Sequence, residues 1–265
     1  MGEFLSVTAL AVLQGVAEFL PVSSSGHLVI GQHFLGMHDA GMRLNVMLHL
    51  GTLIAIFAYY RREILAILAG CLRLERDWLE YSGKLIVAAI PAVPVYFLFR
   101  DGIESLQENV QMVGALLMFT GAVLLGTRLM PRGFKNVGWW RAVIMGIGQA
   151  VALLPGVSRS GMTLAAARGA RVDGAKAAEF SFLMSAPLII GGTVLQAFEA
   201  FSSEACAVEG AVEVGWGWLF WGVAVSAVIG YASLALLVKV IRGRGFWLFG
   251  PYCIFAGLLT LLLAS

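Results

Sequence analysis

The sequence predicts an all-α polytopic membrane protein with two inverted-topology repeats, each a re-entrant helical hairpin followed by three transmembrane helices. Three observations support this fold class: the composition, a duplicated polar segment and the distribution of the basic residues. Hydrophobic residues make up 59% of the chain and charged residues 13%, with a mean hydropathy of +0.85. Soluble domains carry about 25% charged residues. The composition therefore indicates a protein embedded in a lipid bilayer, and the net charge of +2 predicts no nucleic-acid partner.

The duplicated segment lies at 14–27 (QGVAEFLPVSSSGH) and again at 149–162 (QAVALLPGVSRSGM). At a constant offset of 135 residues, seven of the fourteen positions are identical, and the offset is close to half of the 265 residues. We therefore expect one membrane domain, 1–265, with repeat one at 1–135 and repeat two at 136–265. A break in an apolar helix needs partners for its freed backbone groups. Breaks at corresponding positions of two repeats indicate a site near the bilayer midplane.

Six apolar segments approach the length of about 20 residues that a helix needs to cross a bilayer. They lie at 42–60, 82–99, 110–130, 176–198, 215–239 and 245–263. Two further apolar regions, 3–36 and 140–171, are interrupted by the duplicated segment, so we expect each to form a re-entrant hairpin. Each repeat then has three spans, and this odd number inverts the second repeat relative to the first.

The basic residues predict the orientation in the membrane. Fifteen of the 18 fall on one side of the six-span topology, in clusters at 61–84, 128–141, 168–176 and 239–244. The positive-inside rule assigns this side to the cytoplasm. On the opposite side, the loop at 199–214 contains four glutamates and no Lys or Arg. Both termini are therefore expected outside, and the two hairpin tips are expected to meet within the membrane.

The second hairpin tip contains Arg159, the one basic residue that this topology buries. Burying an arginine costs about 2.5–3.5 kcal/mol at a helix centre, so it needs an anion nearby, either a fixed carboxylate or a ligand phosphate. The neighbouring residues favour phosphate, because they combine close backbone approach, hydroxyl donors and a helix N-terminus. These candidate substrate-binding residues are Gly156, Ser158, Ser160 and Thr163. The alternative is an Arg–Glu pair that only fixes the packing of the two hairpins.

The first tip offers complementary groups. Gln14 and Glu18 are four residues apart and share one helix face. Beyond Pro21 follow three serines, a glycine and a histidine: Ser23, Ser24, Ser25, Gly26 and His27. Such groups can hold a hard divalent cation, activate a nucleophile and move a proton. We expect His49, within the span at 42–60, to be a hydrogen-bonded core residue, with a place in the cavity as the alternative.

These motifs resemble the bacterial undecaprenyl-diphosphate phosphatases of the bacitracin-resistance type. The family's (E/Q)-x-x-x-E motif matches Gln14 and Glu18, and its P-G-x-S-R-S-x-x-T motif matches Pro155 to Thr163 without a mismatch. Many family members have glutamate where this chain has Gln14. The resemblance extends over essentially the whole chain and implies a multi-pass protein of the bacterial inner membrane. Its active site would face the periplasmic side or the midplane.

The resemblance implies hydrolysis of undecaprenyl diphosphate to the monophosphate carrier used in cell-wall synthesis. It makes Glu18, Ser24, His27 and Arg159 the candidate catalytic residues. Ser23, Ser25, Ser158, Ser160, Thr163 and Gly156 would bind the diphosphate of this polyprenyl lipid. Glu18 with Gln14 would hold Mg²⁺ or Ca²⁺ or orient the nucleophile, and either Ser24 or His27 would attack phosphorus or activate a water. A homodimer is also compatible with the sequence.

Two other functions compete with this interpretation. Inverted repeats with broken helices are common in secondary transporters, so a transporter or flippase of a phosphorylated polyprenyl lipid is the main alternative. A phosphatidic-acid-phosphatase type of mechanism is less consistent with the sequence. Its S-R-x-x-x-x-x-H motif would need a histidine where this chain has Ala165.

Overall fold

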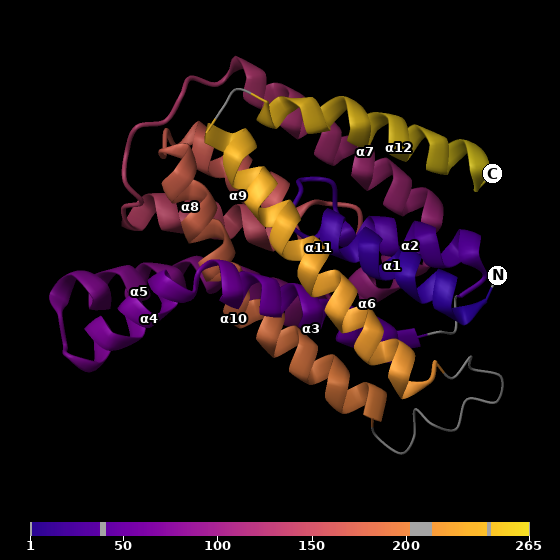
Figure 1. Cartoon of the computed structure of the whole chain (residues 1–265). Helices are drawn as coiled ribbons and strands as arrows, with labels where there is room; N and C mark the ends of the chain where they lie inside the picture. Colours follow the sequence, from indigo (N-terminus) through magenta and orange to yellow (C-terminus); the bar gives the residue numbers. More distant parts are fainter. Residues whose placement is uncertain (1, 38–40, 202–213, 243–244, 265) are drawn as a thin grey trace.

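The computed structural model describes residues 2–37, 41–201, 214–242 and 245–264. These residues are helical almost throughout, and no β-strand occurs among them. Short 3-10 turns at Thr127–Leu129 and Phe246–Leu248 extend two of the helices. Along the chain (Figure 1) the helices are α1 Glu3–Ala17, α2 Ser24–Leu35, α3 Gly41–Tyr59, α4 Arg61–Leu72, α5 Arg76–Ala89, α6 Ala92–Glu108, α7 Val110–Gly126, α8 Trp139–Val151, α9 Arg159–Gly169, α10 Gly174–Phe201, α11 Trp216–Arg242 and α12 Phe249–Leu263.

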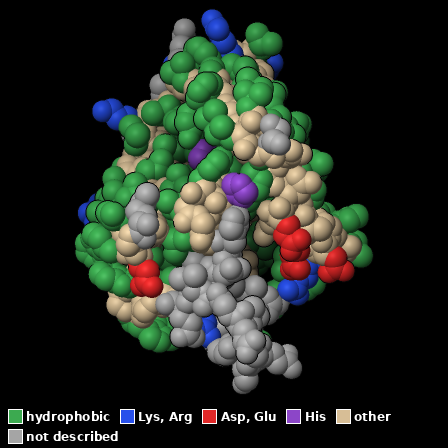
Figure 2. All heavy atoms as spheres, turned by 90° about the vertical axis from the view of Figure 1, so that its right-hand side faces the viewer, with side chains coloured by type: hydrophobic (Ala, Val, Ile, Leu, Met, Phe, Trp, Pro, Cys, Tyr) green, Lys and Arg blue, Asp and Glu red, His purple; other side chains and the backbone are tan. Residues whose placement is uncertain are grey.

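Five helical segments in the described part of the chain are long and apolar enough to cross a membrane. They are Arg76–Glu108, Val110–Leu129, Gly174–Gln196, Trp216–Ile241 and Phe246–Leu263. Large apolar side chains are exposed along these segments, such as Phe97 (71%), Val194 (63%) and Leu262 (66%), and hydrophobic atoms cover much of the face shown in Figure 2. The prediction of an all-helical polytopic membrane protein is confirmed. The sixth expected span, 42–60, corresponds to a shorter apolar helix, Arg43–Tyr59.

The first repeat region differs from the expected pattern in two places. The span expected at 82–99 is a helical pair, α5 and α6, that meets at Ile90 and Pro91. Proline has no backbone N–H and its ring crowds the preceding turn, so the helix cannot continue unbroken through this point. The basic segment before it forms a further helix, α4. With α5 it makes a hairpin that projects from the body of the protein, at the left of Figure 1.

Both interrupted regions form helix–break–helix hairpins. The chain leaves the helix after Ala17 and re-enters at Ser24, and it leaves again after Val151 and re-enters at Arg159. Each second helix begins with the same cap. The Ser23 hydroxyl accepts the N–H of Gly26 (3.3 Å), and the Ser158 hydroxyl accepts the N–H of Gly161 (3.1 Å). Serine is a preferred N-cap because its oxygen satisfies a backbone donor of the first turn.

The hairpins lie at the centre of the fold. α1 packs on α2, α3 and α11, α8 packs on α5, α6 and α9, and α7 lies along α12. Phe19, immediately after the first hairpin's Glu18, is fully buried and meets Phe182 of α10 edge-on at 5.6 Å between ring centroids. Burial of such an aromatic side chain is a large hydrophobic contribution to stability. Core packing therefore anchors the break of the first hairpin next to Glu18.

Part of the predicted topology lies outside the described residues. Most of the acidic loop expected at 199–214 falls there, as does the basic Arg244. The charge clusters that the structure does describe are those at 61–84, 128–141 and 168–176.

Candidate active site

The two hairpin tips contact each other through glycines. A Cβ added to Gly26 would lie 3.0 Å from the Cα of Gly156, closer than most Cβ contacts in proteins. Gly156 itself has a φ of +89°, and a Cβ there would collide with the backbone of α7 at Val113. Glycine is therefore required at Gly156 for both its backbone conformation and its close packing. This contact between the two backbones places residues of both hairpin tips in one site.

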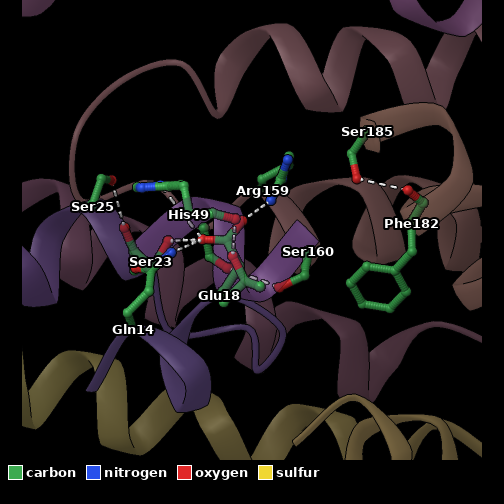
Figure 3. Close-up of polar contacts among 12 residues, drawn as sticks. Gln14, Glu18, Ser23, Ser25, His49, Arg159, Ser160, Phe182 and Ser185 are labelled. Carbon is green, nitrogen blue, oxygen red and sulfur yellow. Dashed lines mark hydrogen bonds and ion pairs between the residues drawn. The ribbon is translucent and has the colours of Figure 1, made fainter. Parts of the chain in front are cut away.

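The centre of this site is an ion pair between Glu18 and Arg159. The Arg159 Nη2 donates to Glu18 Oε1, while the other carboxylate oxygen, Oε2, accepts from Ser24 Oγ (2.6 Å) and from Gln14 Nε2 (3.1 Å). The Glu18 side chain is 2% exposed and the Arg159 side chain 23%. A carboxylate this deeply buried needs both a cation and hydrogen-bond donors, and here it has both. Figure 3 shows Arg159 and Glu18 pointing toward each other from separate segments.

A cavity of about 240 Å³ opens beside this ion pair. Its polar lining comes from both tips and from two neighbouring helices: Glu18, Ser23, Ser24, Ser25, His49, Gln149, Ser158, Arg159, Thr193 and Gln196. Arg159 is the first residue of α9, so the guanidinium and the first backbone N–H groups of that helix lie at the same end of it. A helix N-terminus and an arginine fork both favour phosphate oxygens. The cavity can therefore accept an anion of phosphate type.

The backbone of the first tip is strained where it meets the cavity. Ser23 has a φ of 68° and a ψ of 98°, an unusual conformation for a residue with a side chain. Strain of this kind costs on the order of 1–3 kcal/mol and often occurs at functional sites. The conformation leaves Ser23, Ser24 and Ser25 lining the cavity, with the Ser23 and Ser25 hydroxyls 3.3 Å apart.

The structure does not bring every expected site residue to the cavity. His27 is turned toward α12. Its Nδ1 donates to the Ser23 carbonyl (2.9 Å), which leaves Nε2 to accept from the Tyr252 hydroxyl (2.8 Å), and the two rings stack. The Ser160 hydroxyl donates to the Leu20 carbonyl at 3.2 Å. The Thr163 hydroxyl lies 2.6 Å from that of Ser181 on α10. None of these three side chains, nor that of Gln14, lines the cavity.

His49 is one residue whose position the sequence left open. Its Nδ1 donates to the Asn45 carbonyl one turn earlier (2.8 Å), and its Nε2 lies 3.9 Å from Glu18 Oε2. The His49 ring therefore lines the cavity and also donates a hydrogen bond within its own helix (Figure 3). The expected hydrogen-bonded core position and the alternative position in the cavity each describe part of what is found. The available signal was its spacing within an otherwise apolar span, which does not reveal the face of the helix.

Gln149 is a residue that sequence reasoning missed. It lines the cavity and is 2% exposed, yet neither its amide oxygen nor its amide nitrogen has a hydrogen-bond partner among the described residues. Its counterpart in the duplicated segment, Gln14, donates to Glu18. Buried amides are nearly always hydrogen-bonded, so an unpaired one requires an explanation. The signal that could have identified Gln149 is the duplicated segment, because both of its copies begin with glutamine.

The donor set for a metal ion is small. No three His, Cys, Asp or Glu side chains come together within the described ranges. Mg²⁺ and Ca²⁺ can nevertheless bind through one carboxylate, with substrate phosphates and water as further ligands. Glu18 supplies the carboxylate, and the adjacent Gln14 Oε1 is a buried oxygen without a hydrogen-bond partner in the part of the chain described. Glu18 therefore fits an ion that the substrate completes, whereas Gln14, whose nitrogen faces Glu18 and whose side chain does not line the cavity, would need to turn its amide to reach that ion.

Comparison with known proteins identifies the family of the chain. The family model described as bacitracin resistance protein BacA matches residues 7–259. The chain belongs to the BacA family. Among its BacA relatives is an undecaprenyl-diphosphatase of Desulforapulum autotrophicum, 34% identical over 98% of each chain. An undecaprenyl-diphosphatase of Desulfosudis oleivorans is 35% identical over 98% of each chain. Undecaprenyl-diphosphatase 4 of Bacillus thuringiensis subsp. konkukian is 34% identical over 98% of this chain and 97% of its own.

The family match extends beyond the two hairpins. It includes α3, which contributes His49, and α10, which contributes Thr193 and Gln196 to the cavity. The relatives cover this chain almost from end to end, so they contain counterparts of every element that lines the cavity. The resemblance inferred from two short motifs is therefore confirmed as membership of the whole chain.

Proposed function

We propose that this chain is an integral membrane phosphatase that hydrolyses undecaprenyl diphosphate to undecaprenyl phosphate and inorganic phosphate. The observation that carries the proposal is the ion pair between Glu18 and Arg159, beside a polar cavity in a membrane protein. The BacA-family relatives that match over the whole chain are named undecaprenyl-diphosphatases, which supports the same activity here. The product is the lipid carrier that cell-wall synthesis reuses.

In this proposal Arg159 binds the diphosphate. Its guanidinium already lies against a carboxylate, so an incoming phosphate competes with Glu18 for one or two of its N–H groups. The Ser23, Ser25 and Ser158 hydroxyls supply further donors at the cavity. Fixed donors of this kind stabilise the charge that develops on a transferring phosphoryl group, which is the main catalytic requirement of such reactions.

Ser24 is the proposed nucleophile. Its hydroxyl donates to Glu18 Oε2 at 2.6 Å, which is the arrangement of a nucleophile beside a general base. Ser24 Oγ attacks the terminal phosphorus while its proton passes to Glu18, and the bond from that phosphorus to the bridging oxygen breaks. Undecaprenyl phosphate leaves with the bridging oxygen. Water then hydrolyses the phosphoserine, which releases inorganic phosphate and restores the hydroxyl.

The roles of the other polar residues follow from their contacts. Gln14 holds Glu18 from behind the cavity; Glu18 would bind Mg²⁺ or Ca²⁺, and Gln14 would become a second ligand on turning its amide oxygen toward the ion. Such an ion would supply charge neutralisation at the diphosphate. His49 faces the same carboxylate and can take up or return its proton. His27 supports the tip through Tyr252 and has no chemical role in this scheme.

We further propose that the two halves are inverted repeats with the basic end in the cytoplasm. The helix pairs α1–α2 and α8–α9 correspond at the offset of 135, as do α3 with α10 and α7 with α12. α1 packs on α11 as α8 packs on α5 and α6, which are the corresponding elements. In Figure 1 the start of α1 and the end of α12 lie at one end, opposite the α4–α5 turn and the α9–α10 turn. These features support an outward-facing site between two re-entrant hairpins.

Phosphate release separates this proposal from a transporter or flippase. The purified full chain in detergent is given undecaprenyl diphosphate with Mg²⁺, and free phosphate is measured. We expect phosphate release that is abolished when Arg159 is replaced by alanine. No release by the wild-type chain, together with movement of a phosphorylated lipid across proteoliposomes, would replace the phosphatase by the transport function.

A further inference from the structure

A second cavity lies next to the active site and has a different chemical character. Its volume is about 530 Å³, and it lies between α6 and the end of α8 with the break that follows it. Its lining is apolar in every position. Its lining includes Phe99, Gly102 and Ile103 of α6, together with Ile147 and Leu153 of the second hairpin. We call this cavity the α6–α8 groove.

The α6–α8 groove adjoins the polar cavity through one side chain. Leu153, in the break of the second hairpin, lines both cavities. Leu153 therefore borders the space beside Arg159 on one side and the groove on the other. A molecule with a charged head at Arg159 and an apolar body would pass from one cavity to the other across this residue.

Helix α6 is irregular where it lines the groove. Phe99 departs from helical geometry (φ −121°, ψ 16°), which bends the helix, and its side chain is 61% exposed. Gly102, one turn further along, has nothing within 4 Å of the position that a Cβ would take. The groove is thus open where a second helix would otherwise pack, although α6 and α8 contact each other elsewhere.

We propose that the α6–α8 groove binds the diphosphate-proximal isoprene units of the substrate's polyprenyl tail. This inference rests on the proposed function, since it assigns the tail of the substrate whose diphosphate the polar cavity holds. The continuity through Leu153 selects this occupant. A bulk membrane lipid would cover the groove but would place no charged group in the active site. A protein partner bound at the groove would not need its connection to the cavity beside Arg159. The tail comes from a bilayer that is as apolar as the groove, so its binding there rests on van der Waals packing against the lining residues.

Filling the groove tests the inference. Gly102→Trp puts a large side chain into the groove from a position where a Cβ meets no atom, so the fold should persist. Gly217→Trp is the matched control, because Gly217 of α11 also has nothing within 4 Å and lines neither cavity. Gly102→Ala adds only a methyl group and should resemble the wild type. The three variants and the wild type are assayed with undecaprenyl diphosphate and with dimethylallyl diphosphate, whose single isoprene unit barely enters the groove.

We expect Gly102→Trp to raise KM for undecaprenyl diphosphate by about tenfold, because the indole takes up space that the tail would occupy; a tenfold change corresponds to about 1.4 kcal/mol. Its kcat, and its activity on the short substrate, should change little. Equal KM values in Gly102→Trp and Gly217→Trp would overturn the inference, as would equal losses on both substrates.

A second measurement separates failure of the groove from failure of the proposed function. A polyprenyl diphosphate with a photoreactive group in its third isoprene unit is bound to the full chain and irradiated, and the crosslinked residues are identified. We expect crosslinks to α6 and α8, around Ile103 and Ile147, that excess unlabelled lipid diphosphate suppresses. Crosslinks there without hydrolysis would retain the groove and reject the phosphatase. Hydrolysis with crosslinks confined to other helices would do the reverse.

Discussion

The guanidinium of Arg159 pairs with the carboxylate of Glu18, a residue 141 positions earlier in the chain. Each half of the protein contributes one member of the pair, so neither hairpin alone forms the site. The pair also explains how a charged arginine is tolerated at the second tip when no substrate is bound. The sequence left two partners open for Arg159, a fixed carboxylate or a phosphate, and the geometry allows both in turn.

Replacement of Arg159 tests the proposed diphosphate contact. Arg159→Ala should lower kcat by about 100-fold or more, because a fixed donor to the transferring phosphoryl group is lost. Arg159→Lys retains the charge but loses the planar fork, so it should recover only part of the activity. Phosphate release from undecaprenyl diphosphate measures both. Activity of the alanine variant within a few-fold of the wild type would remove Arg159 from the site.

Replacement of Glu18 tests its proposed roles as base and metal ligand. Glu18→Gln keeps the shape of the side chain but removes the charge that pairs with Arg159 and receives the proton of Ser24. We expect a loss of about 100-fold or more in kcat, in the range that general-base catalysis contributes. Chelation by EDTA followed by titration with Mg²⁺ or Ca²⁺ should restore the wild type at lower ion concentration than the variant. Superimposable titrations would contradict metal binding by Glu18.

Replacement of Ser24 is expected to affect the chemistry, whereas replacement of His27 is expected to affect the stability of the fold. Ser24→Ala should abolish a phosphoenzyme that can be trapped by acid quenching of the wild type during turnover. His27→Ala should retain the phosphoenzyme but lower the thermal stability, since it loses the hydrogen bond to Tyr252. A typical hydrogen bond contributes about 1 kcal/mol. Tyr252→Phe is the matched variant, because it removes the same hydrogen bond from the other side.

The opposite result would reassign the chemistry. A phosphoenzyme that persists in Ser24→Ala and disappears in His27→Ala would identify the histidine as the nucleophile. It would also require the His27 ring to leave Tyr252 and rotate toward the cavity.

The fold was predictable wherever a periodic or compositional signal was strong. The long apolar segments identified the spans, and the duplicated segment located both breaks. The division at Pro91 and the extra helix α4 were missed, because a proline within an apolar run and a basic amphipathic stretch each permit several conformations. In the site, the motifs located Glu18, Ser24 and Arg159. They did not reveal that His27 turns toward Tyr252, since a side chain's direction depends on helices that are distant in sequence.

Replacement of Gln149 is expected to raise the stability of the protein and to weaken substrate binding. The Gln149 amide is buried without hydrogen-bond partners among the described residues, and it lines the cavity beside Arg159. An unpaired buried polar group destabilises a protein by about 1–3 kcal/mol. Gln149→Leu has nearly the same volume and no polar atoms, so it should raise the melting temperature of the substrate-free protein. We propose that a phosphate oxygen of the substrate is the partner of this amide, so we expect the KM for undecaprenyl diphosphate to rise in Gln149→Leu.

Gln14→Leu is the matched control for this exchange, since it is the corresponding glutamine of the first repeat and its amide already donates to Glu18. It should lower stability, because the substitution removes a hydrogen bond to a buried carboxylate. Differential scanning calorimetry of both variants, with and without vanadate, separates the effect on stability from the effect on phosphate binding. The wild type should gain stability from this phosphate mimic, and Gln149→Leu should gain less. If Gln149→Leu is destabilised to the same extent as Gln14→Leu and retains the wild-type response to vanadate, the Gln149 amide has a structural role and does not contact the substrate.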